Sequence, residues 1–84
     1  MLTPYAPRLG QALRQMRQQR GMTQAAVAAL AGLPREKIVQ IEQGRDSVAL
    51  RAYVAAAEAL GAELALRPVQ RPTLDEVRAL LADD

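Results

Sequence analysis

Hydrogen-bond donors are concentrated in one short stretch of this sequence. Arg35, Lys37 and Gln40 lie near the start of a segment with helical spacing of apolar residues, which follows another short helical segment across a turn containing Gly32. A helix that carries Arg, Lys and Gln at its start, placed after such a turn, has the geometry needed to read the major groove of DNA. These side chains therefore favour nucleic-acid recognition.

Catalytic chemistry is not expected from this sequence. It contains no His and no Cys, so Ser47 has no histidine base to activate it. The acidic residues are scattered without the clustering that a metal site needs, and no glycine-rich phosphate loop is present. We therefore expect no enzyme activity, no metal and no cofactor.

The charges are distributed unevenly along the chain. Residues 1–45 contain seven basic and two acidic residues, a net charge of +5, whereas residues 46–84 contain four and seven, a net charge of −3. A basic region suits a polyanion, because Lys and Arg that neutralise phosphates release condensed counterions. Solvated helix faces are the alternative explanation of the same charges.

The length and composition favour one small helical domain. The 84 residues are 50% hydrophobic, yet Phe and Trp are absent and Tyr occurs twice. A core of Ala, Leu, Val, Ile and Met is typical of packed helices. Because such a short chain buries a thin core and has no Cys for disulfides, dimerisation would add stability. Neither a signal peptide nor an apolar run of membrane-spanning length is apparent, so we expect a cytoplasmic protein.

Four segments with helical apolar spacing are each followed by a glycine, the residue that favours a left-handed conformation at a helix C-terminus. These glycines are Gly21, Gly32, Gly44 and Gly61. We expect the first helix over residues 7–20. The second helix should begin at Thr23, whose hydroxyl can cap it, and end at Ala31.

The third and fourth helices are expected to present apolar stripes to the core. The third should open at or near Pro34, with Ile38 and Ile41 facing inward. Ser47 is the expected cap of the fourth helix, and Tyr53 is expected at the margin of its stripe. The buried stripe itself is expected to consist of Leu50, Val54, Ala57 and Leu60.

After the fourth helix the apolar period changes to two, which predicts one short strand. Its apolar positions, Ala62, Leu64 and Leu66, alternate with Glu63, Ala65 and Arg67 before Pro68. Pairing with the same strand of a second copy would satisfy the backbone of this lone strand. Thr73 and Glu76 form a capping box for a fifth helix with an acidic tail. We expect a helix-turn-helix unit over residues 7–61 and a dimerisation or partner-binding segment over residues 62–84.

Three stretches of the sequence resemble the Xre/Cro-like family of lambdoid phage repressors. They are Arg20-Gly21-Met22-Thr23-Gln24, Ala29-Leu30-Ala31-Gly32 and Ile38-Val39-Gln40-Ile41-Glu42-Gln43-Gly44. The resemblance covers about residues 9–61 and implies a lambda-repressor-like fold that binds DNA. Together with the pattern above, the expected fold is all-α, with five helices and one short C-terminal strand.

The resemblance also implies roles for individual residues. Arg35, Glu36 and Gln40 match base-reading positions, since Arg pairs with guanine, Gln pairs with adenine and Glu accepts a hydrogen bond from cytosine. Glu36 has a second possible role as the partner of Arg35 or Gln40. The positions that match phosphate contacts are Thr23, Gln24, Lys37 and Arg45. Arg17 and Glu42 match a salt bridge between the first and third helices.

Residues 60–68 resemble the strand that follows the helical domain in HipB-like antitoxins. This implies a homodimer joined through Leu64 and Leu66, with recognition helices about 34 Å apart on a palindromic operator. It also implies a toxin that binds the acidic C-terminal helix, whose apolar residues could instead form core. These residues are Leu74, Val77, Leu80 and Leu81. The expected function is a DNA-binding transcriptional repressor that acts as antitoxin and autorepressor, and the alternatives are a stand-alone phage-type regulator or a protein-binding adaptor.

Overall fold

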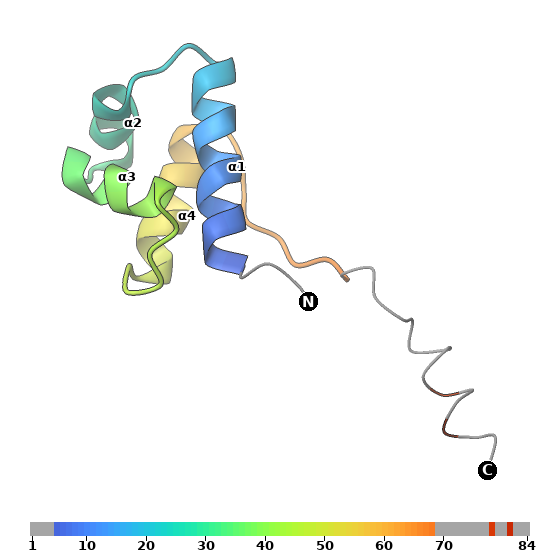
Figure 1. The fold of residues 1–84 in the computed structure, drawn as a ribbon. Helices are drawn as coiled ribbons and strands as arrows, with labels where there is room; N and C mark the ends of the chain where they lie inside the picture. Colours follow the sequence, from blue (N-terminus) through green and yellow to red (C-terminus); the bar gives the residue numbers. More distant parts are fainter. Residues whose placement is uncertain (1–4, 69–77, 79–80, 82–84) are drawn as a thin grey trace.

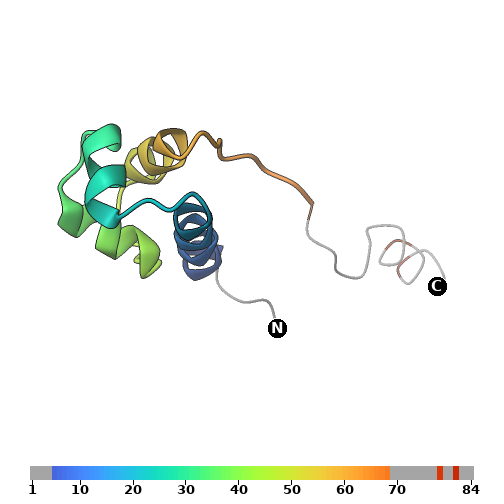
Figure 2. The same cartoon turned by 90° about the horizontal axis from the view of Figure 1, so that it is seen from above.

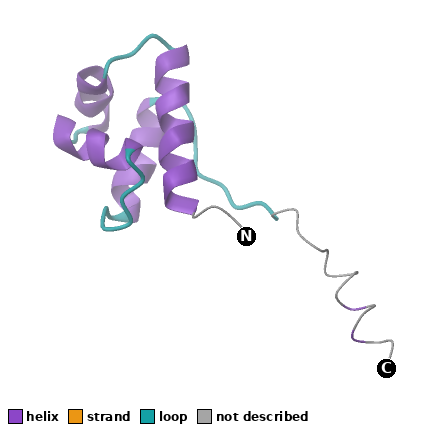
Figure 3. Cartoon of the chain, in the orientation of Figure 1, coloured by secondary structure: helices purple, strands orange, loops and turns teal. Residues whose placement is uncertain are grey.

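The computed structural model describes residues 5–68 together with Arg78 and Leu81, and this part of the chain contains helices but no strand (Figure 1). The helices are α1 (Tyr5–Gln19), α2 (Gln24–Ala31), α3 (Arg35–Glu42) and α4 (Leu50–Ala59). Figure 3 shows the loops that join them. These bounds confirm the four helices predicted before residue 62. None of the helices is long and apolar enough to span a membrane.

Local signals fix the two ends of α2. The Thr23 hydroxyl oxygen accepts a hydrogen bond from the Ala26 amide at 3.0 Å, which confirms the predicted cap. At the other end Gly32 adopts a φ of 69°, a left-handed conformation that glycine tolerates without strain. Pro34, with a φ of −62°, then precedes the first residue of α3. This short turn sets the direction of α3 relative to α2.

The core is centred on α3, which packs against α1, α2 and α4. Ile38 and Ile41 are each 1% exposed, and they join Val27 of α2 and Ala57 of α4 in one buried cluster. Burying an aliphatic side chain of this size contributes about 1.5–3 kcal/mol. The predicted inward orientation of both isoleucines is therefore confirmed.

Two glycines allow α1 and the end of α3 to approach closely. A Cβ added at Gly10 would overlap the carbonyl oxygen of Ile41 and lie 2.9 Å from the Gly44 backbone nitrogen. A Cβ added at Gly44 would in turn overlap the backbone of Pro7, and Gly44 also has a φ of 72°. Backbone therefore lies directly against backbone here, and no side chain larger than hydrogen fits at either position.

The predicted start of α4 was wrong. The N-cap position is Ala49, which makes no side-chain cap hydrogen bond, and Ser47 is exposed. The buried face of this helix also differs from the predicted one. Leu50 is 70% exposed, whereas Tyr53, predicted at the margin, is 4% exposed and lies in the core. The Tyr53 hydroxyl donates a hydrogen bond to the Arg45 carbonyl at 2.7 Å.

The predicted strand after α4 is not observed in the described chain. Residues 62–68 have no regular secondary structure and lead away from the helical body (Figures 1 and 2). Leu64 packs partly against the core, but Leu66 is 97% exposed. A strand needs hydrogen-bonded backbone beside it, and within the described residues the backbone of this segment makes one hydrogen bond, from the Ala62 amide to the Ala57 carbonyl of α4 at 2.9 Å. The fifth helix predicted from Thr73 lies outside the described residues, apart from Arg78 and the exposed Leu81.

Candidate DNA-recognition site

The site begins with the exposed face of α3. Ile38 and Ile41 hold α3 in the core, whereas Arg35 and Glu36 of its first turn are exposed. Glu36 makes no side-chain hydrogen bond to any described residue, so the predicted pairing with Arg35 or Gln40 is not observed. Gln40, one turn after Glu36, is partly buried. The start of α3 therefore offers a guanidinium and a carboxylate to a partner molecule.

An open groove of about 620 Å³ lies beside this face of α3. Three helices and the turn before α2 contribute polar or charged side chains to it, and these are Arg14, Arg17, Thr23, Gln24, Arg35, Glu42 and Gln43. Of the predicted DNA-contacting residues, Thr23, Gln24 and Arg35 line the groove. The remaining four, Glu36, Lys37, Gln40 and Arg45, lie on or just after α3 without lining it.

Arg14 of α1 is a groove residue that the sequence pattern did not identify. It lies nearly one helical turn before Arg17 and is exposed, and it makes no side-chain hydrogen bond or ion pair with the described residues. Its position could have been inferred, because residues three apart on a helix lie on the same side. Arg14 is therefore a positive charge of α1 available to a ligand in the groove.

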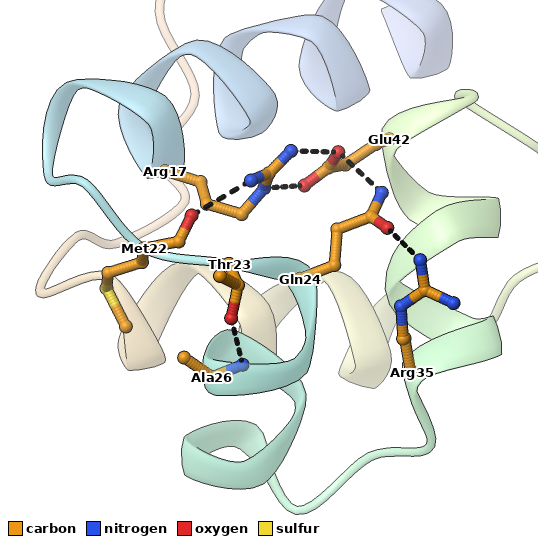
Figure 4. A network of polar contacts seen from close by, with 7 residues as sticks. All are labelled: Arg17, Met22, Thr23, Gln24, Ala26, Arg35 and Glu42. Carbon is orange, nitrogen blue, oxygen red and sulfur yellow. Dashed lines mark hydrogen bonds and ion pairs between the residues drawn. The ribbon is translucent and has the colours of Figure 1, made fainter.

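The predicted ion pair between α1 and α3 is present and nearly buried (Figure 4). The Arg17 Nε lies 2.6 Å from Oε2 of Glu42, and its Nη2 donates to Oε1 at 3.1 Å. The Arg17 Nη1 also donates to the Met22 carbonyl at 2.9 Å. The hydrogen bond to Glu42 raises the pKa of Arg17 above its ordinary value, although burial acts in the opposite direction. This guanidinium is thus committed to the scaffold.

Gln24 extends the ion pair into a chain of hydrogen bonds that reaches the exposed surface. Its Nε2 donates to Oε1 of Glu42 at 3.2 Å, and its Oε1 accepts from Nη2 of Arg35 at 3.2 Å (Figure 4). Gln24 had been predicted to contact a DNA phosphate. In the structure its Oε1 and one Nε2 hydrogen are engaged within the protein, and the second Nε2 hydrogen remains for another acceptor, so the phosphate contact stays a prediction.

The loop after α3 positions Arg45. Its backbone is held by the Tyr53 hydroxyl, and its amide donates to the Gln40 carbonyl at 3.1 Å. The Arg45 Nε donates to the side-chain oxygen of Gln43 at 2.9 Å, so the exposed guanidinium lies against the end of α3. Tyr53 also acquires a raised pKa, first because of burial and second because of the negative charge of Asp46.

Comparison with known families finds one match that spans three quarters of the chain. Residues 8–70 match the family described as helix-turn-helix domain. The matched region includes all of α2, α3 and α4 and the larger part of α1. No curated protein matches the sequence.

Proposed function

From the premise that the chain belongs to the helix-turn-helix domain family, a family of DNA-binding regulators, we propose that it recognises a specific double-stranded operator and represses transcription. One observation carries this proposal: Arg35 and Glu36 are exposed in the first turn of α3, while Ile38 and Ile41 of the same helix are buried in the core. Such a helix enters a major groove with its side chains already positioned.

The contacts that we assign divide into base reading and phosphate binding. Arg35 donates two hydrogen bonds to guanine, Gln40 pairs with adenine, and Glu36 accepts from a cytosine amine. The cationic side chains of Lys37 and Arg45 bind phosphates on either side, together with the Thr23 region at the start of α2. Base contacts supply the sequence preference, whereas phosphate contacts supply affinity and register.

The repressor acts as a homodimer in this proposal. Among the described residues, the backbone of residues 63–68 makes no hydrogen bond to other backbone, and the exposed Leu66 follows the half-buried Leu64 by one strand repeat. Pairing with the same segment of a second copy would satisfy these groups and set two α3 helices about 34 Å apart on a palindrome. Leu66→Asp should then yield monomers in light scattering. The matched control is Leu50→Asp, which changes an exposed leucine of α4 and should leave the dimer intact.

The finer role that we propose is that of an antitoxin which represses its own operon. Its support is the sequence of residues 60–68, which resembles an antitoxin strand, and the acidic segment that follows it, with Leu74, Val77, Leu80 and Leu81. Co-purification of the full chain with the product of the adjacent gene tests this role. Repression without any bound gene product would favour a stand-alone regulator.

Fluorescence anisotropy with the DNA upstream of the protein's own gene tests the main proposal. The titration is made at two salt concentrations and repeated with a scrambled duplex. We expect a preference of about a thousandfold for the native duplex, with affinity that falls as salt rises. If both duplexes bind equally weakly, this DNA is not a specific target. If the protein also shows no preference within a library of random duplexes, the result would favour a protein-binding adaptor.

A further inference from the structure

A second open groove, of about 830 Å³, lies between the first half of α1 and residues 65–68, which run past that helix (Figure 1). We call it the α1 groove. Single apolar side chains are normal on a protein surface, but several exposed in one groove indicate an interaction site. Tyr5 and Leu66 are 55% and 97% exposed. The apolar lining consists of Tyr5, Leu9, Ala12, Ala65 and Leu66.

The charged residues that line the α1 groove are both basic. They are Arg8 and Arg67, and among the described residues no acidic side chain lines the groove. The guanidinium carbon of Arg8 lies 5.6 Å from the centroid of the Tyr5 ring, a cation–π distance. Arg67 is exposed and makes no side-chain hydrogen bond or ion pair with the described residues. A partner that fits this groove should therefore combine apolar with acidic side chains.

The C-terminal segment, residues 73–84, has this combination. It contains four acidic residues and one basic residue, a net charge of −3. The structure describes two of its residues, Arg78 and Leu81, and both are helical. Leu81 is 70% exposed, so its apolar side chain is not covered within one chain. The apolar residues recur at the three- and four-residue spacing of one helix face, and they are Leu74, Val77, Leu80 and Leu81.

We propose that the α1 groove of each copy binds residues 73–84 of a second copy as an amphipathic helix. The apolar face of the segment covers Leu66 and the exposed side of α1, and its carboxylates lie near Arg67. This inference rests on the homodimer of the proposed function and deepens it, because it gives the dimer a contact besides the pairing of residues 62–68.

The occupant is a second copy rather than the groove's own chain. Within one chain Leu81 stays exposed, so its own groove does not cover it. Antiparallel pairing of residues 62–68 places residue 68 of each copy opposite residue 62 of the other. Ala62 packs against the core, so each C-terminal segment emerges beside the helices of the other copy. Residues 69–72 span up to about 13 Å from that point, which is enough to reach the groove.

Cysteine trapping tests the contact directly, because the chain has no Cys of its own. Ala12→Cys places a thiol in the groove, and Leu81→Cys places one on the segment. The two full-length variants, distinguished by mass, are mixed and oxidised, and a disulfide needs Cα atoms within about 7 Å. We expect disulfide-linked pairs that contain one chain of each variant.

The matched control replaces Ala12→Cys with Leu50→Cys. Leu50 is 70% exposed, as Leu81 is, but it lies outside the groove, so trapping to Leu81→Cys should stay at background. Trapping of Ala12→Cys no stronger than this control would overturn the inference. A double variant, Ala12→Cys/Leu81→Cys, that forms its disulfide only within one chain would overturn it as well, because the segment would then occupy its own groove.

Dimer dissociation, measured by light scattering over a dilution series, tests which side of the segment docks. Leu81→Asp should weaken dimerisation by about tenfold or more, since a leucine is lost from an apolar contact. Ala79→Asp adds the same charge at a position that the helical period places on the opposite side, and it should have an effect of less than about twofold. Equal weakening by both variants would contradict docking through the apolar face.

The salt dependence of the same dissociation tests the charged contact. Arg67→Gln should weaken dimerisation by about twofold to fivefold at low salt, the effect of one exposed ion pair, and the difference from wild type should shrink as salt rises. Arg51→Gln is the control, because it removes an exposed charge of α4 outside the groove. If the two variants behaved alike, Arg67 would not face the acidic segment.

These measurements separate failure of the inference from failure of the proposed function. A monomeric wild-type chain in light scattering would overturn both the homodimer and the docked segment. A dimeric wild type without trapping above the control would overturn the docked segment alone. Mixed disulfides in a protein that shows no preference among duplexes would support the docked segment and overturn the proposed DNA recognition.

Discussion

Different interactions fix the inner, core-facing side of α3 and its outer, exposed side. The inner face is fixed by buried isoleucines and by glycines that bring α1 into backbone contact, so an added atom has no space. The outer face is exposed, and its first residue is held by a single hydrogen bond at 3.2 Å. Changes on the inner face should therefore alter stability, whereas changes on the outer face should alter binding with little effect on folding.

Gly10→Ala should produce the largest effect, on the inner face. The new methyl group would overlap the Ile41 carbonyl and force α1 away from α3. Overpacking of this kind costs about 3 kcal/mol of unfolding free energy, which outweighs the helix-propensity gain of about 1 kcal/mol from replacing glycine. Urea denaturation monitored by circular dichroism measures this loss.

A matched glycine separates steric overlap from backbone strain. Gly21 has a φ of 66°, but a Cβ there would meet no atom within 4 Å. Gly21→Ala should therefore cost only the left-handed strain, about 1 kcal/mol. If Gly10→Ala proved no more destabilising than Gly21→Ala, close contact between α1 and α3 would not be the constraint on the inner face.

Arg35→Ala should produce the next largest effect, on the outer face. We expect operator affinity to fall by about 1–3 kcal/mol with relaxed preference at one base pair. The melting temperature should stay close to that of the wild type, because Arg35 is exposed. Anisotropy and thermal unfolding on the same protein check both statements, and parallel losses of affinity and stability would mean that the two faces are not independent.

The sequence predicts the inner face of α3 better than the surroundings of that helix. Apolar spacing identified Ile38 and Ile41, and glycine punctuation located the helix ends, since both are local signals. The close approach at Gly10 was missed because it depends on the distant Gly44, although a glycine inside a helix is itself a clue. Ser47 was a plausible cap by residue type, yet packing starts α4 after Ala49 and turns Tyr53 inward.

The candidate site was predicted by residue type more completely than by geometry. Resemblance supplied Arg35, Glu36 and Gln40 as base readers, but it did not indicate that Gln24 connects Arg35 to Glu42. That connection depends on the side-chain directions of residues 11 and 18 positions apart in sequence. Spacing along the chain carries no information about such directions.

Tyr53→Phe should have a smaller effect. It tests the hydrogen bond that connects Tyr53 in the core to the loop carrying Arg45. Loss of the hydrogen bond to the Arg45 carbonyl should cost about 1 kcal/mol of unfolding free energy near neutral pH. Because burial raises the pKa of Tyr53 above its ordinary value of 10.0, the folded state favours the neutral phenol. The stability from this group is therefore complete below pH 10 and is lost as pH rises through the folded-state pKa.

The alkaline limb of the stability profile tests that assignment. Unfolding by urea at neutral pH and again at about pH 11 should show a smaller loss in Tyr53→Phe than in the wild type. Tyr5→Phe is the control, since Tyr5 is 55% exposed on α1. If Tyr5→Phe flattened the profile as much as Tyr53→Phe, the alkaline loss would not arise from the core tyrosine.

Arg14→Gln should have the smallest effect and tests how far the outer binding face extends onto α1. Arg14 lines the groove beside Arg35, so we expect it to contact a phosphate when α3 occupies the major groove. Its loss should lower the slope of log affinity against log salt by about 0.9 and leave base preference unchanged. The control, Arg8→Gln, removes the same charge beside Tyr5, outside that groove. Both variants lose one positive charge, so the control accounts for the loss of long-range attraction. A reduced salt slope in Arg14→Gln alone would extend the DNA-contacting surface from α2 and α3 to α1. Equal salt slopes in the two variants would limit that surface to α2 and α3.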